Sequence, residues 1–298
     1  MSLSLGLDIA KSSLSVNADR AGVTSRNIAA ANDPTARRKS LETISRAGGG
    51  VQAGRIVRAV DVALSERLRT ATTEAGGHAA VLKGLEGLQQ IIGAPGDGLS
   101  PAEVIAELQR SLDAFAANPS DAVAANTAVG AARQVAETLQ QGTRTVQDIR
   151  ASADAEIAAG VERLNGLLEK FDKLNGQIVS GTRSGTDVTD QEDERDRVLS
   201  EISSLIGIRT LTRDDQDMVI LTDGGLTLFE TTPRLVSFEP SGAMTAGSVG
   251  NAIYVDGMPI TGSGATGVRR TGELVGLAQV RDELAPAFQS QLDEIARG

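Results

Sequence analysis

Residues 1–40 carry a repeating pattern of apolar and small side chains. The spacing alternates between four and three residues, as at the a and d positions of a heptad repeat, which is typical of a helix that packs lengthwise on another helix. Ala, Asn and Thr fill half of these positions, so the apolar face is shallow, and Ile9, Val16 and Val23 form a flanking stripe. We name the heptad positions the N-terminal seam: Leu3, Leu7, Ala10, Leu14, Asn17, Ala21, Thr24 and Ile28.

The helix that carries this seam is predicted to end in a polar turn. A helix of about 28 residues is roughly 42 Å long and owes most of its stability to packing, so the seam should lie against a partner. Asn32, Asp33 and Pro34 follow it, and Pro34 cannot continue a helix. The basic run Arg37-Arg38-Lys39 is interpreted as solvated charge, and 48–50, all glycine, as a flexible joint. We therefore expect 1–50 to be a separate region, disordered in the monomer.

Longer helical patterns follow this region. Ser100, Pro101 and Glu103 form a helix start, and the Pro-free apolar period from about 120 to 181 predicts a rod of about 60 residues, roughly 90 Å long. Shorter helices are predicted at 191–206 and 272–296. A heptad-like series is predicted from Val57 onward, with a weak point at Gly76-Gly77, and its face holds Leu64, Leu68, Ala71, Ala75, His78, Leu82, Leu85, Gln89 and Ile92.

Between the last two helices the period changes to that of strands. Short β-branched runs are separated by turn residues such as Asp223-Gly224-Gly225. Strands are predicted at 208–212, 218–222, 226–230, 235–238 and 253–255, followed by a glycine-rich loop at 262–267. The fold class is thus mainly α with a small β insert: a long-helix, coiled-coil-like rod (51–207 and 268–298) with an inserted antiparallel β domain at 208–267.

The composition narrows the classes of function. Only 2% of the 298 residues are aromatic, and none is Trp, so Leu, Ile, Val and Ala must fill the core, which suits helix seams better than deep ligand pockets. A net charge of −10 argues against a nucleic-acid partner. The lack of Cys excludes disulfides and thiolate metal sites. We expect no cleaved signal peptide and no membrane span, because no apolar run approaches the necessary ~18 residues.

Candidate chemistry is sparse. His78 is the only histidine, and its place in the heptad-like series suggests a half-buried packing residue. The acidic residues between 187 and 196 lack the spacing of a calcium loop and suit a helix start. Asp214, Asp215 and Asp217 are interpreted as turn residues. With neither a Gly-x-Ser-x-Gly elbow nor a phosphate-binding glycine loop, we expect no enzyme, no cofactor and no metal.

Residues 25–38 resemble a motif of the bacterial flagellar axial proteins, Ser-Asn-Asn-Ile-Ala-Asn-Ala-Asn-Thr-Pro-Gly-Tyr-Ser-Arg. Thr35 and Ala36 replace the Gly and Tyr of that motif. Later stretches at 50–69, 194–203 and 272–283 also resemble these proteins, in the right order. The set is most similar to the family of flagellar hook-associated protein 1. The matching residues of the motif are Ser25, Asn27, Ile28, Ala29, Ala31, Asn32, Pro34 and Arg38.

This resemblance implies a structural subunit at the junction of the flagellar hook and filament. It implies type III export and a location outside the cell, with assembly through the N-terminal seam and a motif turn formed by Asn27, Asn32, Pro34 and Arg38. Implied partners are further copies, the hook protein, the next junction protein and an export chaperone. The family ends in a second heptad helix that pairs with the N-terminal helix. Because this chain stops at Gly298, we expect a truncated form.

Two alternatives stay open. Another rod, hook or filament subunit would share the N-terminal pattern, although the stretches at 194–203 and 272–283 favour the junction protein. A cytosolic coiled-coil binding module would instead dimerise through residues 3–28. That module would form a stable dimer whose fraction does not depend on concentration, whereas an axial subunit would be a monomer with a loose N-terminus.

Overall fold

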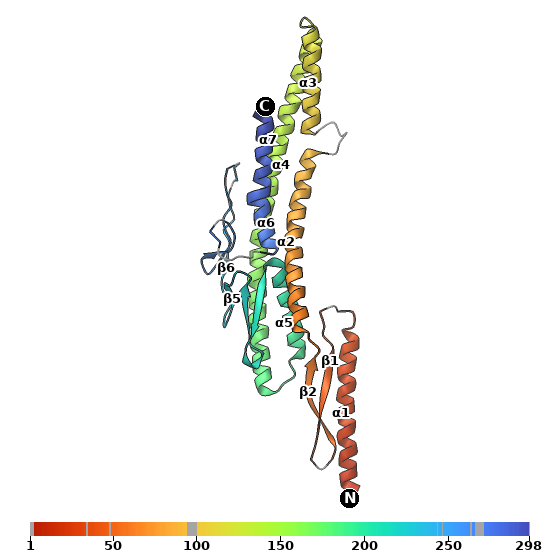
Figure 1. Cartoon of the computed structure of the whole chain (residues 1–298). Helices are drawn as coiled ribbons and strands as arrows, with labels where there is room; N and C mark the ends of the chain where they lie inside the picture. The colour runs from red at the N-terminus through yellow and green to blue at the C-terminus, as the bar shows by residue number, and fades with distance from the viewer. Residues whose placement is uncertain are drawn as a thin grey trace. The chain divides into compact units, whose positions relative to one another are not determined.

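A computed structural model describes residues 3–33, 35–47, 49–93, 100–242, 244–245, 247–262, 264–265 and 271–297. Long helices and small antiparallel sheets make up the described chain, which confirms the predicted fold class (Figure 1). Two compact units are present: Met1–Thr72 with Leu164–Leu235, and Thr73–Arg163 with Val236–Gly298. The division into 1–50, a rod and a β domain stays a prediction, and its boundaries do not coincide with those of the two units.

The first unit begins with a helix packed on a β-hairpin. Helix α1 (Leu3–Ala29) is followed by β1 (Lys39–Ser45) and β2 (Val51–Arg58), which pair antiparallel (Figure 1). Gly49 and Gly50 have φ of 97° and 91°, which only glycine adopts readily, so these two residues of the predicted joint lie in the turn of this hairpin. The prediction of a helix from Val57 was wrong: the β-branched residues of 51–58 form a strand, and α2 (Val62–Ile92) begins later.

The rest of the first unit is a helix pair covering a sheet. The end of α4 (Ala122–Ser184) and α5 (Thr189–Leu205) supply the helices, and β3 (Ile208–Thr212), β4 (Met218–Thr222) and β5 (Thr227–Phe229) form the sheet in that order. Phe171 of α4 meets Phe229 of β5 edge to face, with ring centroids 4.9 Å apart. The predicted turn aspartates lie in the β3–β4 connection, which includes the short helix η1 (Asp214–Gln216) and Asp217.

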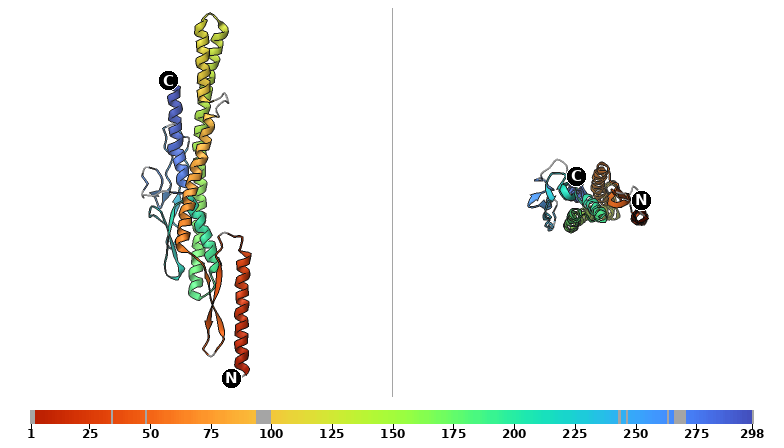
Figure 2. Two further views of the ribbon diagram at one scale, coloured as in Figure 1. Left: turned by 45° about the vertical axis from the view of Figure 1, so that its right-hand side comes forward. Right: turned by 90° about the horizontal axis from the view of Figure 1, so that it is seen from below.

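The second unit is a bundle around the C-terminal helices. It contains α2 from Thr73, α3 (Pro101–Ala117), the first part of α4, α6 (Glu273–Gln279), a π-helical turn η2 (Val280–Leu284) and α7 (Ala285–Arg297). α3 and α4 run side by side as a helical hairpin (Figure 2). The predicted start of α3 is confirmed, because the Glu103 amide donates a 3.2 Å hydrogen bond to Ser100 Oγ. Leu88, Val146, Ala285 and Leu292 form one core cluster.

The stretch of the predicted β insert contains two small antiparallel sheets. β6 (Val236–Ser237), β7 (Tyr254–Val255) and β8 (Met258–Pro259) form a second antiparallel sheet, which belongs to the second unit. Most of the predicted loop at 262–267 lies outside the described residues.

The face of α2 that is buried is not the one that the heptad-like series predicts. Its buried residues, among those described, are Thr73, Ala80, Gly84 and Leu88, three of which are small. Gly276 lies so close to α2 that a Cβ there would be 2.5 Å from the carbonyl oxygen of Gly77. Small residues let two helix backbones approach, which increases their dispersion contacts. His78 is exposed rather than half-buried, and the Ile92 side chain lies outside the described residues. The predicted positions that are exposed are Leu64, Leu68, Ala71, Ala75, His78, Leu82, Leu85 and Gln89.

Candidate functional site

The N-terminal helix has two apolar faces, and the fold uses one of them. Val16 and Val23 of the flanking stripe are each 4% exposed, on the side of α1 that contacts β1 and β2. All eight residues of the N-terminal seam are exposed, with Leu3 94%, Leu7 69% and Leu14 72% accessible. The seam thus remains free in the described chain. Its role in assembly stays a prediction.

The motif turn is held by one side chain in particular. The Asn27 Nδ2 atom donates to the Lys39 carbonyl oxygen at 2.8 Å, and the Lys39 amide donates to Asn27 Oδ1 at 2.9 Å. This pair of bonds ties the last turn of α1 to the first residue of β1, which gives a physical reason for an amide side chain at position 27. Asn32 and Arg38 are exposed, and Pro34 lies outside the described residues.

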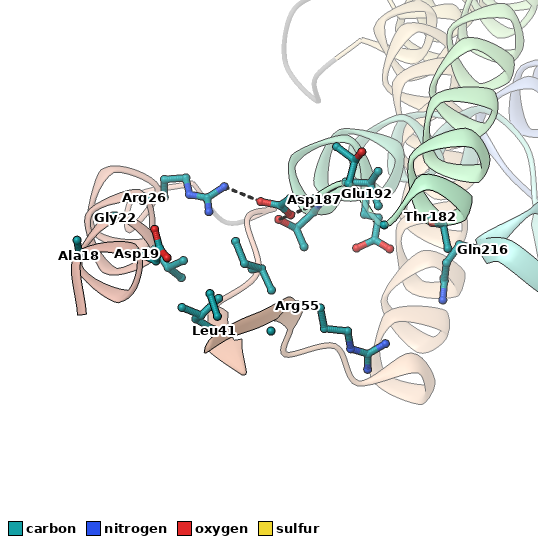
Figure 3. A pocket seen from close by; sticks show the side chains of 18 residues that line it. Ala18, Asp19, Gly22, Arg26, Leu41, Arg55, Thr182, Asp187, Glu192 and Gln216 are labelled. Carbon is teal, nitrogen blue, oxygen red and sulfur yellow. Dashed lines mark hydrogen bonds and ion pairs between the residues drawn. The ribbon is translucent and has the colours of Figure 1, made fainter. Parts of the chain in front are cut away.

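Six acidic side chains lie at or just before the start of α5, and five of them meet basic side chains from the N-terminal region, whereas Glu194 pairs with Lys170 and Arg197. We call these six side chains the acidic cluster. Arg26, at the end of α1, lies 3.0 Å from Asp187 Oδ2, as the dashed line in Figure 3 shows. Lys39 pairs with Asp190 and, at 2.9 Å, with Asp193. The members of the cluster are Asp187, Asp190, Glu192, Asp193, Glu194 and Asp196.

Arg58 is the third basic partner of the acidic cluster. Its guanidinium pairs with Asp196 and lies 2.8 Å from Asp193 Oδ1 and 3.4 Å from Glu192 Oε2. In the reverse direction, Arg197 of α5 donates a 2.8 Å hydrogen bond to Asp33 Oδ2 in the turn after α1. The acidic residues that were interpreted as a helix start therefore also form ion pairs with the N-terminal region. The sequence pattern did not reveal these ion pairs.

The prediction that the run 37–39 is solvated was wrong for Lys39, which is only 7% exposed. Burial disfavours its charge, but hydrogen bonds to Asp190 and Asp193 outweigh this, and the pKa of Lys39 is raised. For Arg58 burial is likewise outweighed, here by the charge of Asp196 and its neighbours, and the pKa is raised. A buried ammonium group needs carboxylate partners, and the cluster supplies them.

These shifts predict how pH affects the first unit. Hydrogen bonds from Thr35 lower the pKa of Asp33 below its usual 3.8. Burial raises the pKa of Asp187, but hydrogen bonds from Thr189 and Arg26 outweigh burial, so the pKa of Asp187 is also lowered. The stabilisation from both carboxylates is present above 3.8 and is lost as pH falls through the lowered values, while that from Lys39 is lost above 10.5. We expect the exchange protection of β1 amides to be constant between about pH 5 and pH 9 and to fall in stronger acid. A steady loss of protection from pH 9 to pH 5 would contradict this assignment.

The stretch 194–203 also supplies a buried arginine. Arg195 Nη1 donates to Asn175 Oδ1 at 2.9 Å and to the Gln216 carbonyl oxygen at 2.7 Å. Gln216 and Asp215 have φ of 62° and 56°, in the left-handed region that costs energy for side chains other than glycine. Burial lowers the pKa of Arg195. This side chain thus holds the β3–β4 connection in a strained conformation.

The stretch 272–283 contains the corresponding arginine of the second unit. Arg281, 1% exposed, donates from Nη1 to Asp154 Oδ1 at 2.5 Å and from Nη2 to Asp282 Oδ2 at 2.7 Å. Arg150, fully buried, donates to the Arg281 carbonyl oxygen at 2.9 Å and to that of Thr245 at 2.8 Å. The four charges of this group cancel, as burial requires.

No group of three or more His, Asp or Glu side chains within the described residues could hold a metal ion. None of the helices described above is both long enough and apolar enough to cross a membrane. A cavity of about 780 Å³ lies among α1, the hairpin and the α4–α5 connection, lined by mixed polar and apolar side chains such as Asp19, Leu41 and Gln216 (Figure 3).

Comparison with known proteins shows the family. The family of the flagellar hook-associated protein FlgK helical domain matches residues 85–298. The chain belongs to the FlgK helical domain family. It is similar to flagellar hook-associated protein 1 of Escherichia coli strain K12, at 22% identity over 98% of this chain and 53% of that protein. The Bacillus subtilis strain 168 protein of the same name is 26% identical over 69% of this chain and 43% of its own length.

A solved structure supports the same fold. The flagellar hook junction protein FlgK from Burkholderia pseudomallei aligns with a TM-score of 0.58 and 21% identity, over 72% of this chain and 39% of that one. The chain therefore spans about half the length, or less, of the FlgK relatives that it matches. Two of the segments that carry the resemblance hold a buried arginine each: 194–203 holds Arg195 of the first unit, and 272–283 holds Arg281 of the second.

Proposed function

We propose that this chain is a structural subunit of the bacterial flagellum, located at the junction between hook and filament outside the cell. Membership in the FlgK helical domain family and the names of the relatives support this role. A non-enzymatic function is consistent with the rod-like helices and the sparse candidate chemistry. Partners are further copies of the chain and other axial proteins, including the hook protein and the next junction protein. An export chaperone and export without a cleaved signal belong to the same proposal.

The observation that carries this proposal is the free seam on a helix that is already folded. Val16 and Val23 are the buried side chains with which α1 packs on its hairpin. Leu3, Leu7 and Leu14 are exposed, so they are not needed for the folding of the described chain. Apolar side chains in heptad register on an exposed face are suited to pairing with a second helix. Identical contacts repeated head to tail build an open array rather than a closed oligomer. An axial structure requires such contacts.

The test is a charge placed in the seam. We expect Leu7→Asp and Leu14→Asp each to abolish filament growth when the variant replaces the hook-associated protein 1 of its host. Both side chains are exposed, so the unfolding midpoint of each purified variant should stay close to that of the unmodified chain. Leu112→Asp, on an exposed position of α3 outside the seam, is the matched control and should permit growth.

Two outcomes would count against the proposal. Filament growth with either seam variant would show that the seam is not the assembly face. A dimer whose fraction is independent of concentration in light scattering, and which Leu14→Asp dissociates, would favour the cytosolic coiled-coil module instead.

A further inference from the structure

The π-helical turn η2 interrupts the helix that runs from α6 into α7. In this turn the Ala285 amide donates to the carbonyl oxygen of Val280, five residues earlier, instead of to that of Arg281, four residues earlier. A π turn holds about one residue more than an α-helical turn, so it rotates everything that follows by roughly 100° relative to a continuous α-helix. The turn therefore determines which side of α7 faces the bundle.

Two side chains favour the π turn over an α-helical turn. The Arg281 carbonyl oxygen has lost the Ala285 amide, and Pro286, five residues further on, has no N–H to replace it. The Nε atom of Arg150, on α4, donates to this carbonyl oxygen at 2.9 Å and takes the place of the helical donor. In a continuous α-helix the Pro286 ring would also clash with the carbonyl group of Asp282, four residues earlier.

The Arg150 side chain is held in position by its other two nitrogens. Nη1 donates to the Thr245 carbonyl oxygen at 2.8 Å, and Nη2 donates to that of Ser248 at 2.5 Å. The side chain is fully buried, so water could not replace any of these bonds if Arg150 gave one up. The rigid guanidinium fork thus directs Nε at the Arg281 carbonyl oxygen.

The stripe of α7 that the π turn buries is poorly suited to a core. It consists of Ala285, Gln289 and Leu292, which are 0%, 3% and 4% exposed. Gln289 Nε2 donates to Thr143 Oγ1 at 3.2 Å, but Gln289 Oε1 is buried and has no hydrogen-bond partner among the described residues. A buried acceptor without a donor is costly, so this stripe is not buried for the sake of its own packing.

A more apolar stripe lies one residue earlier on the same helix. It has the same spacing of four and three residues, and three of its four members are large and apolar. Leu284 and Phe288 are only partly buried against the core cluster, and Ile295 is 41% exposed. We call this set the second stripe: Leu284, Phe288, Gln291 and Ile295.

We infer that η2 is a register lock, in which Arg150 and Pro286 hold α7 one residue away from a second, fully α-helical register. In that register each residue of α7 takes the place that the next residue occupies in the π-turn register, so the second stripe faces the bundle. Packed helices can change register without unfolding the elements around them. The second unit therefore contains a two-state element, and the outer face of its C-terminal helix changes when the lock opens.

The experiment detects the register through the reactivity of single thiols. The chain has no Cys, so Gln289→Cys and Gln291→Cys, made separately, each introduce one thiol. Position 289 is buried and position 291 is exposed, and the second register exchanges the two. In the chain without other changes, we expect a maleimide to label the thiol at 289 at least about tenfold more slowly than the thiol at 291, because a buried thiol reacts only when its segment opens.

The release variant is Arg150→Lys/Pro286→Ala. Lysine keeps the positive charge that the buried carboxylates require but lacks the guanidinium fork, and alanine supplies the missing helical N–H and removes the ring. In this variant we expect labelling at 289 to become at least about tenfold faster and labelling at 291 at least about tenfold slower. Loss of structure alone would accelerate labelling at 289 but would not slow it at 291, so the slower reaction is specific to a change of register.

The matched control is Arg144→Lys/Pro101→Ala, which makes the same two replacements elsewhere in the second unit. Arg144 is exposed on α4, and Pro101 is the first residue of α3. Neither residue belongs to α6, η2 or α7. Both labelling rates should stay within about twofold of those in the chain without these replacements, because surface substitutions change stability little.

Three results would overturn the inference. They are unchanged labelling in the release variant, faster labelling at 289 without slower labelling at 291, and a control that behaves as the release variant does. If the release variant lost its helical circular dichroism, Pro286→Ala alone would decide, because it leaves the buried charges in place and adds a good helix former. An unchanged rate at 291 in that variant would overturn the inference. Filament growth is not a readout here, so failure of this inference is separate from failure of the proposed function.

Discussion

Replacing Asp154 with Ala should destabilise the second unit by about 3–5 kcal/mol, because removal of one member of a buried ion pair leaves an uncompensated charge. Asp154 is 4% exposed and accepts from Arg281 Nη1 at 2.5 Å and from the Ser241 amide at 2.7 Å. Without the carboxylate, Arg281 retains Asp282, yet the Ser241 amide and one guanidinium nitrogen lose their acceptors. Chemical denaturation followed by circular dichroism, with hydrogen exchange of α6 to identify the unit that unfolds, measures this change.

The control for this prediction lies on the same helix. Asp148 of α4 is exposed, and Asp148→Ala should change the free energy of unfolding by less than about 0.5 kcal/mol. If Asp154→Ala lowered the free energy of unfolding by less than about 1 kcal/mol, water would have to replace the carboxylate. The buried group of Arg150, Arg281, Asp154 and Asp282 would then be accessible to solvent.

Gly276→Val should cost about 3 kcal/mol through overpacking, at the upper end of the usual range, because the atoms in the way belong to a backbone. A Cβ at position 276 would lie 2.5 Å from the Gly77 carbonyl oxygen and 3.1 Å from the Ala80 Cβ. Neither neighbour can rotate away, so α6 and α2 would have to separate. The loss should appear as a lower denaturation midpoint and faster exchange of amides in α6.

Gly176→Ala is the matched control for this glycine. Nothing lies within 4 Å of a Cβ built at Gly176, which is inside α4. Ala is the better helix former, so this substitution should stabilise the chain by up to about 1 kcal/mol. Equal effects of the two substitutions would show that helix propensity, rather than the close approach of α2 and α6, determines the result.

Local features could be predicted from the sequence because neighbouring residues determine them. Strands β3 and β4 have the predicted limits, and Ser100 caps α3, since both depend on turn chemistry and capping within a few residues. The family resemblance was confirmed by the match of the FlgK helical domain family to residues 85–298. The hairpin of β1 and β2 was missed because its turn was interpreted as a flexible joint between a coil and a helix.

The choice of buried face could not be predicted in the same way. The heptad count selected the leucines of α1 and α2. The fold instead buries Val16 and Val23 on α1, and on α2 it places Gly77 against α6 and Gly84 against Val280. A glycine scores as polar or as a helix breaker in a periodicity count, although it allows the closest helix contact. Which stripe faces inward depends on the partner element, and a single sequence does not name that partner.

The ion pairs between the N-terminal region and the acidic cluster could not be predicted for a related reason. Lys39 and Asp190 are 151 residues apart in sequence, so no local pattern connects them. The basic residues Arg26, Lys39 and Arg58 and the acidic cluster each looked like ordinary surface charge when considered separately. Opposite charge on two distant segments is a weak indication of contact until the topology brings them together.

The two faces of α1 are subject to different evolutionary constraints. Val16 and Val23 pack inside the chain, so replacements there should co-vary with residues of the hairpin such as Leu41 and Ile56 in the same gene. Leu7 and Leu14 have no such partner among the described residues, and their replacements should be independent of the hairpin sequence. One helix would then carry two unlinked sets of substitutions, separated by about half of its circumference.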